Sequence, residues 1–306
     1  NRYRDSFSAK LLTFIKYDPA ESEWSEALQA RAAHIAHALS VHDSEPPQSL
    51  ADVAIVVALR EPEMEAFRRL PWQWSLHSQP RDHSVHWSGT IDSPAGPRTV
   101  RLVSANRMGM APAAVLTTKL VELVRPRWVG LGGIAAGVKG KVNLGDVVIA
   151  DPCWDAGAGK WLKTGDKTEF MPGPHHVPLE PWVRERCLSV ATDHRALAEI
   201  RAAWRGAKPD TALAVHVGPM ACVSAVMAEG ETLAKIVSGQ HRETMGLDME
   251  SYAVMLAAQD CSSPQPTAIV AKGIVDFADG FKDDRYRDYA AYASAEVLRL
   301  IFKDVL

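Results

Sequence analysis

The sequence predicts an α/β fold, a single-domain three-layer sandwich in which one central, mostly parallel or mixed β-sheet lies between layers of helices. Between residues 51 and 306, apolar or alternating segments of strand length are repeatedly followed by helical segments. Hydrophobic residues make up 47% and charged residues 23% of the 306 residues. This composition is typical of globular proteins, and it excludes wholesale disorder, collagen-like sequence and coiled-coil rods.

The expected strands are apolar or alternating runs. Residues 52–59 form an apolar run as long as a buried strand, and residues 84–92 and 99–105 alternate as half-buried strands do. Further strands are expected at 127–131, 146–150, 212–217, 245–247 and 267–275.

The helical segments lie between these strands. Helices are expected at 61–70, 111–124, 182–204, 224–237, 249–259 and 288–305. Pro126 ends the helix at 111–124, because proline disfavours helical backbone in the residue before it. Residues 152–181 are rich in Gly, Pro and His, and they predict a long loop, either a lid or plain surface.

Residues 1–50 differ from the rest and predict a helical segment with a linker, ahead of a domain at 51–306. Asp18-Pro19 is typical of a helix start. The apolar residues Trp24, Leu28, Ala32, Ile35 and Leu39 then recur every three or four positions. One amphipathic helix cannot bury its own stripe, so we expect it to dock on the domain or on a partner. Residues 42–50 predict the linker.

Charge and cysteine content narrow the function classes. The formal net charge of −3 gives no global attraction to nucleic acid or to an acidic membrane. No apolar run approaches the ~20 residues that a membrane-spanning helix needs, and no signal peptide is visible. The four cysteines lack metal-ligand spacing, so we expect reduced thiols, a cytoplasmic protein and no bound metal. The chain opens with Asn1 rather than Met, which suggests a piece of a longer protein.

A glycine-dense segment at residues 130–137 follows an expected strand. Such a segment lets backbone N–H groups approach an anion or a sugar closely. It is neither a dinucleotide fingerprint nor a P-loop, because Ala135 replaces a required glycine in both patterns. A tight packing turn between strand and helix explains the segment equally well.

Carboxylates follow three expected strands, at the edge where open α/β sheets bind ligands. Each group also has a structural explanation: helix capping, loop solvation or an acidic first helical turn. The residues are Asp248 and Glu250, Asp276 and Asp279, and Glu61, Glu63 and Glu65.

Four sequence stretches occur together in a recognisable order. They are residues 56–67, 133–137 with 144–151, 247–251, and 272–279. From about residue 52 to residue 301, the chain resembles the nucleoside phosphorylase and nucleosidase superfamily. Within it, the methylthioadenosine/S-adenosylhomocysteine nucleosidases are the most similar branch. The resemblance implies a nucleoside phosphorylase-like domain that cleaves a purine–ribose N-glycosidic bond.

The resemblance also implies roles for individual residues. Asp276 matches the general acid that protonates N7 of the departing base. Glu250 matches the residue that holds the ribose hydroxyls, with Met249 packing on the sugar. Glu63 matches the acid that activates water in the hydrolytic branch.

The remaining substrate-binding residues implied by the resemblance surround these groups. They are Asp248, Gly133, Ile134, Ala135, Cys222, Val223, Val226 and Phe277, with Arg107 and Arg60 as candidates for contact with a phosphate. Three of the positions depart from the family. Ile134 and Val275 replace serines, and Val226 stands where an aromatic often stacks on the base. Loss of the hydroxyl at Ile134 weakens the case for phosphate as co-substrate.

The first expectation is therefore a hydrolytic purine nucleosidase that uses no cofactor and forms a homo-oligomer, a dimer or larger. One alternative is a phosphorylase that uses inorganic phosphate as co-substrate. A second is an AMP or ATP nucleosidase effector domain of a larger signalling or defence protein with a sensor region. A third is a catalytically idle nucleotide-binding module. The expected partner is a small purine nucleoside or nucleotide, and neither nucleic acid nor a membrane is expected.

Overall fold

The structure is a computed structural model. It describes residues 24–25, 28–33, 50–80, 82–164, 167–225, 235–236, 239–279 and 284–306. The chain divides into two units, Asn1–Gln48 and Ser49–Leu306.

In the first unit, the described residues 24–25 and 28–33 are helical. They lie within the helix expected from the apolar stripe, and Leu28 on that stripe is 51% exposed. The other residues of this expected helix lie outside the described residues, as does the linker apart from Leu50. Docking of the stripe therefore stays a prediction.

The second unit contains a nine-stranded mixed sheet among its described residues, in the order β10-β9-β6-β11-β5-β1-β4-β3-β2. Strand β5 is parallel to both β1 and β11, whereas β6 is antiparallel to β11. Strand β10 pairs with β9 and also with β5, which closes that side of the sheet on itself. The strands are β1 (Val53–Val57), β2 (Ser75–His77), β3 (His86–Ser93), β4 (Gly96–Ser104), β5 (Trp128–Gly137), β6 (Val147–Asp155), β9 (Val215–Cys222), β10 (Gly246–Asp248) and β11 (Thr267–Asp276).

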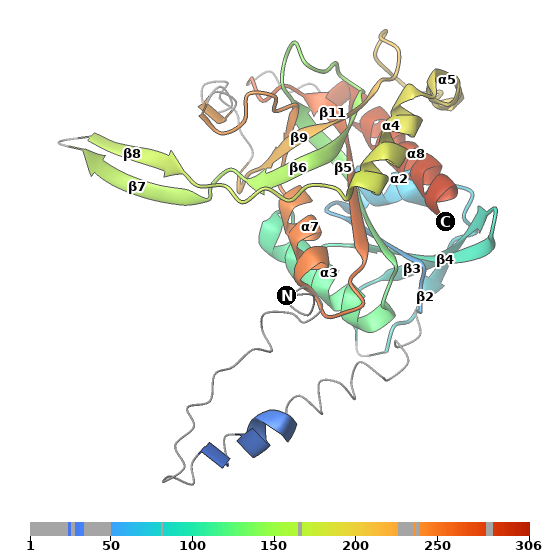
Figure 1. The fold of residues 1–306 in the computed structure, drawn as a ribbon. Coiled ribbons are helices and arrows are strands. Elements are labelled where there is room, and N and C mark those ends of the chain that lie inside the picture. Colours follow the sequence, from blue (N-terminus) through green and yellow to red (C-terminus); the bar gives the residue numbers. More distant parts are fainter. Residues whose placement is uncertain are drawn as a thin grey trace. The chain divides into compact units, whose positions relative to one another are not determined.

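Helices cover the sheet, and Figure 1 shows the resulting layers. Helices α3 and α7 pack against each other, and α8 packs on β5 and β11. The helices are α2 (Glu65–Arg68), α3 (Met110–Val124), α4 (Pro181–Thr192), α5 (His194–Ala203), α7 (Ser251–Asp260) and α8 (Arg287–Val305), with a π-helical turn η2 (Arg60–Met64) and a 3₁₀ turn η3 (Asp284–Tyr286). The expected three-layer sandwich with a mixed sheet is confirmed.

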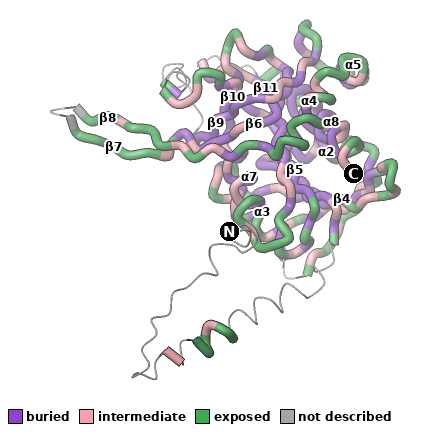
Figure 2. Tube along the Cα trace, in the orientation of Figure 1, coloured by how far each residue is buried: buried purple, intermediate pink, exposed green. Residues whose placement is uncertain are grey.

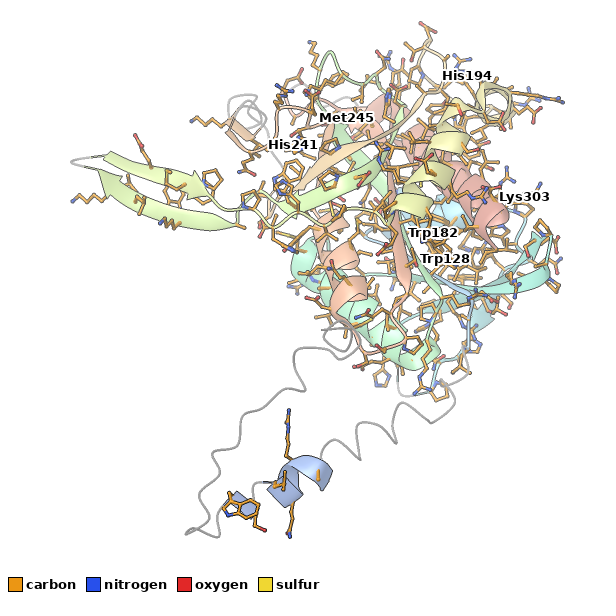
Figure 3. All side chains as sticks on the ribbon, in the orientation of Figure 1. Trp128, Trp182, His194, His241, Met245 and Lys303 are labelled. Atoms are coloured by element: carbon orange, nitrogen blue, oxygen red, sulfur yellow. The ribbon has the colours of Figure 1, made fainter. Side chains whose placement is uncertain are left out.

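The core lies along the central strands. All five residues of β1 are buried, as the unbroken apolar run predicts for a strand covered on both faces. Figure 2 shows this burial continuing through β5 and β6. On β5, the ring of Trp128 meets Trp182 of α4 edge to face, with centroids 5.4 Å apart (Figure 3). No helix among the described residues is long and apolar enough to cross a membrane.

The glycine-dense segment is part of β5 and not a loop after it. Its glycines let neighbouring side chains approach the strand. A Cβ on Gly132 would lie 2.4 Å from the ring of Phe67, and one on Gly130 would lie 2.7 Å from Ile55. The glycines therefore let Phe67 and Ile55 pack directly against the backbone of β5.

Two further expectations need correction. The long loop expected at 152–181 contains a hairpin of β7 (Gly159–Thr164) and β8 (Lys167–Pro172), which extends from the domain (Figure 1). Rings of Trp161 and Phe170 pair across it at 5.3 Å. The single helix expected at 182–204 is two helices. Asp193 separates them because its side chain accepts a hydrogen bond from the backbone N of Ala196 and caps α5. Most of the helix expected at 224–237 lies outside the described residues.

Candidate active site

A cavity of about 250 Å³ opens where β1, β5 and β11 end, next to β10 and the start of α8. This is the strand-end position that open α/β sheets use for ligands. Eight of the predicted site residues line it: Glu63, Ile134, Ala135, Val223, Asp248, Met249, Glu250 and Asp276.

Glu63 is held by backbone N–H groups from β5 and from the residues that follow β1. Its Oε2 accepts hydrogen bonds from the N–H groups of Ala58 and Leu59, both at 2.8 Å, just beyond the end of β1. Its Oε1 accepts one from Ile134 on β5 at 3.0 Å. Glu63 is 1% exposed, and this burial raises the pKa of its carboxyl group. The positive charge of Lys272 lowers the same pKa, but its effect is smaller than that of burial. A buried carboxylate with a raised pKa is suited to accept a proton.

The absence of a side chain at Gly133 leaves room for the carboxylate of Glu63. A Cβ at Gly133 would lie 2.1 Å from Oε1 of Glu63, so only glycine fits under the carboxylate. The N–H of Gly133 donates to Oγ of Ser294 at 2.9 Å, and the next N–H, of Ile134, donates to Glu63. Both groups are therefore occupied within the protein and do not form a cradle for an anion.

Glu250 lies in a buried ion-pair network with Lys272. Oε1 of Glu250 accepts a hydrogen bond from the N–H of Gly109 at 2.9 Å, and Oε2 accepts one from Nζ of Lys272 at 3.1 Å. Nζ of Lys272 also lies 3.3 Å from Oδ2 of Asp248. Burial by itself would lower the pKa of Lys272, but Glu250, Asp248 and Glu63 together raise it well above its ordinary value. Lys272 therefore keeps a fixed positive charge behind the carboxylates.

Asp248 has a structural contact as well as a place in the cavity wall. Its Oδ2 accepts a hydrogen bond from the N–H of Ser251 at 2.9 Å, and its Oδ1 accepts one from Oγ of Ser251 at 2.6 Å. These bonds hold the first turn of α7. The capping role and the site role considered from the sequence are thus both compatible with its position.

Asp276 ends β11 and faces the cavity. Pairing between β11 and β5 shifts by one residue between Ile274 and Asp276, an irregularity of the kind that redirects a side chain. Oδ1 of Asp276 accepts a hydrogen bond from the N–H of Ala278 at 3.0 Å. Ala278 has a left-handed φ of 51°, which bends the chain back toward the carboxylate. The position of Asp276 suits contact with a bound base.

The other predicted site residues lie elsewhere. Cys222 is fully buried, and neither it nor Phe277 lines the cavity. Arg60 and Arg107 are exposed and outside the cavity wall. Gly133 lies beneath Glu63. Val226 falls outside the described residues.

Sequence reasoning missed several residues of the site. Lys272 had a usable signal: it is the one charged residue inside the apolar run of β11, and buried lysines are almost always paired. The other missed residues belong to several different strands, turns and loops, and no local pattern indicates that these elements converge. These lining residues are Ala58, Leu59, Met108, Ala136, Ala225, Leu247, Ala278, Asp284 and Arg287, with Val275 noted only as a departure.

Among the described residues, no group of three or more His, Cys, Asp or Glu is placed to hold a metal ion.

Comparison with known proteins places the chain in a family. A model of the phosphorylase superfamily matches residues 52–305. The uncharacterized protein y4jS of Sinorhizobium fredii is 28% identical over 300 residues, 96% of this chain and 72% of that protein. The ATP nucleosidase Cap17 of Escherichia coli is 29% identical over 229 residues, 70% of this chain and only 43% of the relative.

A solved structure agrees with this family at the level of fold. The 5′-methylthioadenosine/S-adenosylhomocysteine nucleosidase of Neisseria meningitidis superposes with a TM-score of 0.62 at 20% identity. The superposition covers 83% of this chain and 99% of the nucleosidase. Because the family match extends over nearly all of the second unit, this chain belongs to the phosphorylase superfamily.

Proposed function

We propose that this protein hydrolyses the N-glycosidic bond of a purine nucleoside or nucleotide and releases the free base. The observation that carries the proposal is the convergence of Asp276, Glu250 and Glu63 on one cavity, with Lys272 behind them. The relative named as an ATP nucleosidase supports the same reaction class. No cofactor is needed for this chemistry, and we propose that none is used.

Asp276 is the proposed general acid. When the bond between the sugar carbon C1′ and the base nitrogen N9 breaks, its electron pair moves into the purine ring. A protonated carboxyl at Asp276 gives its proton to N7, so the base leaves neutral. The hydrogen bond from the N–H of Ala278 fixes one oxygen of Asp276 and leaves the other for the base.

Glu250 is the proposed partner of the ribose. As the base leaves, the sugar becomes an oxocarbenium-like cation, and a carboxylate on its hydroxyls stabilises that charge more than it stabilises the ground state. Each oxygen of Glu250 already accepts one hydrogen bond, from Gly109 and from Lys272, and each keeps lone pairs for a ribose hydroxyl. The contact with Nζ of Lys272 holds the carboxylate of Glu250 in place.

Water, rather than phosphate, is the proposed nucleophile. Glu63 takes a proton from water as the water oxygen bonds to C1′, which yields the free sugar. The N–H groups of Gly133 and Ile134 donate to Ser294 and Glu63, so these two donors are not available to hold phosphate. The carboxylate of Glu63 would also repel phosphate at that place.

The test is chromatography of purine nucleosides and nucleotides after incubation, with and without inorganic phosphate. We expect free base and a free ribose-type product in phosphate-free buffer. Release of ribose 1-phosphate alone, with no turnover when phosphate is absent, would contradict hydrolysis and favour the phosphorylase alternative. Binding of purine nucleotides without any cleavage would favour the idle binding module.

We further propose that the protein works in the cytoplasm as a homo-oligomer, in association with a sensor or signalling region. The chain spans 43% of the length of the Escherichia coli ATP nucleosidase, so that relative has regions beyond the shared part. The exposed side chain of Leu28 on the expected apolar stripe supports a contact through residues 20–39. Light scattering of the full chain and of a form that begins at Ala51 tests the homo-oligomer and the contact through the stripe. A monomeric full chain would refute the oligomer, and an unchanged oligomer after trimming would refute the role of the stripe.

A further inference from the structure

The ionisable side chains that line the cavity are almost all acidic. Among the described lining residues, Arg287 is the single basic side chain. The acidic ones are Glu63, Asp248, Glu250 and Asp276, with Asp284 exposed close to Arg287 in the sequence. An anionic group on the substrate would be repelled over most of this wall. Arg287 is therefore the one side chain of the described wall that can attract it.

The guanidinium of Arg287 reaches the part of the cavity next to the turn after β1. Its Nη2 donates a hydrogen bond of 3.5 Å to the backbone carbonyl oxygen of Glu61, in the turn that follows β1. In the sheet, β5 lies between β1 and β11, and Asp276 ends β11. Asp276 and Glu250 are the proposed partners of the base and the ribose, so the remaining end of the substrate, its 5′ carbon, is the part left to meet Arg287.

The chemistry of arginine suits one class of 5′ group. A guanidinium has five N–H donors in a planar fork that matches two phosphate oxygens, and the bond to Glu61 engages one of the five. Arg287 also begins α8, whose first turn has a partial positive charge. Resting on the proposed function, we propose that the substrate is a purine nucleotide and that Arg287 binds the phosphate on its 5′ carbon.

The neighbouring arginines provide matched controls. Arg285 lies two residues earlier, is exposed, and does not line the cavity. Its replacement removes the same charge from the preceding turn η3 without removing a lining side chain. Arg60, one of the sequence-predicted phosphate contacts, is likewise exposed and outside the wall, and it serves as a second control.

The experiment measures kcat/KM for adenosine, guanosine and their 5′-monophosphates and 5′-triphosphates, with free base as readout. The decisive quantity is the ratio of nucleotide to nucleoside for one base. We expect the wild-type protein to prefer the nucleotide and Arg287→Gln to lower the ratio by about 10- to 100-fold, as for loss of a charged hydrogen bond. Arg287→Lys should recover part of the ratio, Arg287→Glu should lower it further, and Arg285→Gln and Arg60→Gln should keep it within about twofold.

Each other outcome has a definite meaning. If Arg287→Gln lowers kcat/KM equally for nucleotide and nucleoside, Arg287 has a structural role and the proposal is overturned. If the wild-type protein cleaves nucleosides as well as nucleotides, this proposal fails while the proposed function stands. If no purine nucleoside or nucleotide releases base, the proposed function itself fails and this proposal falls with it.

Discussion

Replacement of Lys272 by methionine tests the charge network at the base of the site. Methionine has a similar length and no charge, so it fills the volume but leaves Glu250 and Asp248 buried without their cation. Nζ of Lys272 lies 3.1 Å from Glu250 and 3.3 Å from Asp248, and its side chain is 0% exposed. Removing one partner of such a buried pair costs about 3–5 kcal/mol of unfolding free energy. In a domain of this size, that corresponds to a fall in Tm of roughly 6–20 °C.

Urea and thermal unfolding of the variant measure this cost. The matched control is Lys303→Met, the same chemical change at an exposed position on α8 (Figure 3). Surface changes of this kind usually stay within about 0.5 kcal/mol. The double variant Lys272→Met with Glu250→Gln should recover part of the loss, because it removes one of the two uncompensated charges.

Activity provides an independent readout of the same network. Burial raises the pKa of Asp248 and the charge of Lys272 opposes this, so without that charge the pKa of Asp248 should rise further, and protonated Asp248 would hold the turn that carries Glu250 less well. The acid limb of the pH–rate profile should therefore move to higher pH in Lys272→Met, whereas Lys272→Arg should retain the wild-type limb. A loss of less than about 1 kcal/mol together with an unchanged pH profile would refute the network.

The remaining predictions concern the other site residues. Asp276→Asn should lower kcat for base release by about 10²-fold or more, because asparagine can hydrogen-bond N7 but cannot protonate it, and near-normal turnover would exclude the acid role. Gly133→Ala should displace the Glu63 carboxylate, since the new Cβ would lie 2.1 Å from Oε1, and activity equal to wild type would show that Glu63 is not needed where it lies. Because the folded pKa of Glu63 is raised above 4.5, the folded state binds the extra proton, so stability should fall as pH rises from 4.5 through the folded pKa. In Glu63→Gln this pH dependence of the unfolding free energy, which approaches about 1.4 kcal/mol per pH unit, should be absent. If the unfolding free energies of the two proteins change in parallel with pH, the raised pKa of Glu63 is contradicted.

Local patterns in the sequence determined most of the secondary structure. The apolar run of β1, the alternation in β3 and β4 and the helix α3, which ends before Pro126, each follow from side chains a few residues apart, and the structure has them close to where they were expected. The positions of Asp276, Glu250 and Glu63 just after or at the end of strands were also visible in the sequence, and all three line one cavity. An acid that directly follows an apolar run stands at a strand end, so this position can be recognised from neighbouring residues in the sequence.

Tertiary structure decided how these groups are paired. The sequence does not show that the backbone N–H of Ile134 belongs to Glu63, which lies 71 positions away, or that Lys272 faces Glu250, 22 positions away. Nor does it show that Arg287 lies at the cavity while Arg60 and Arg107 lie outside it. These facts depend on which strands are neighbours and on how closely the glycines of β5 allow other elements to approach. Close packing acts between residues that are distant in sequence, so no local pattern contains it.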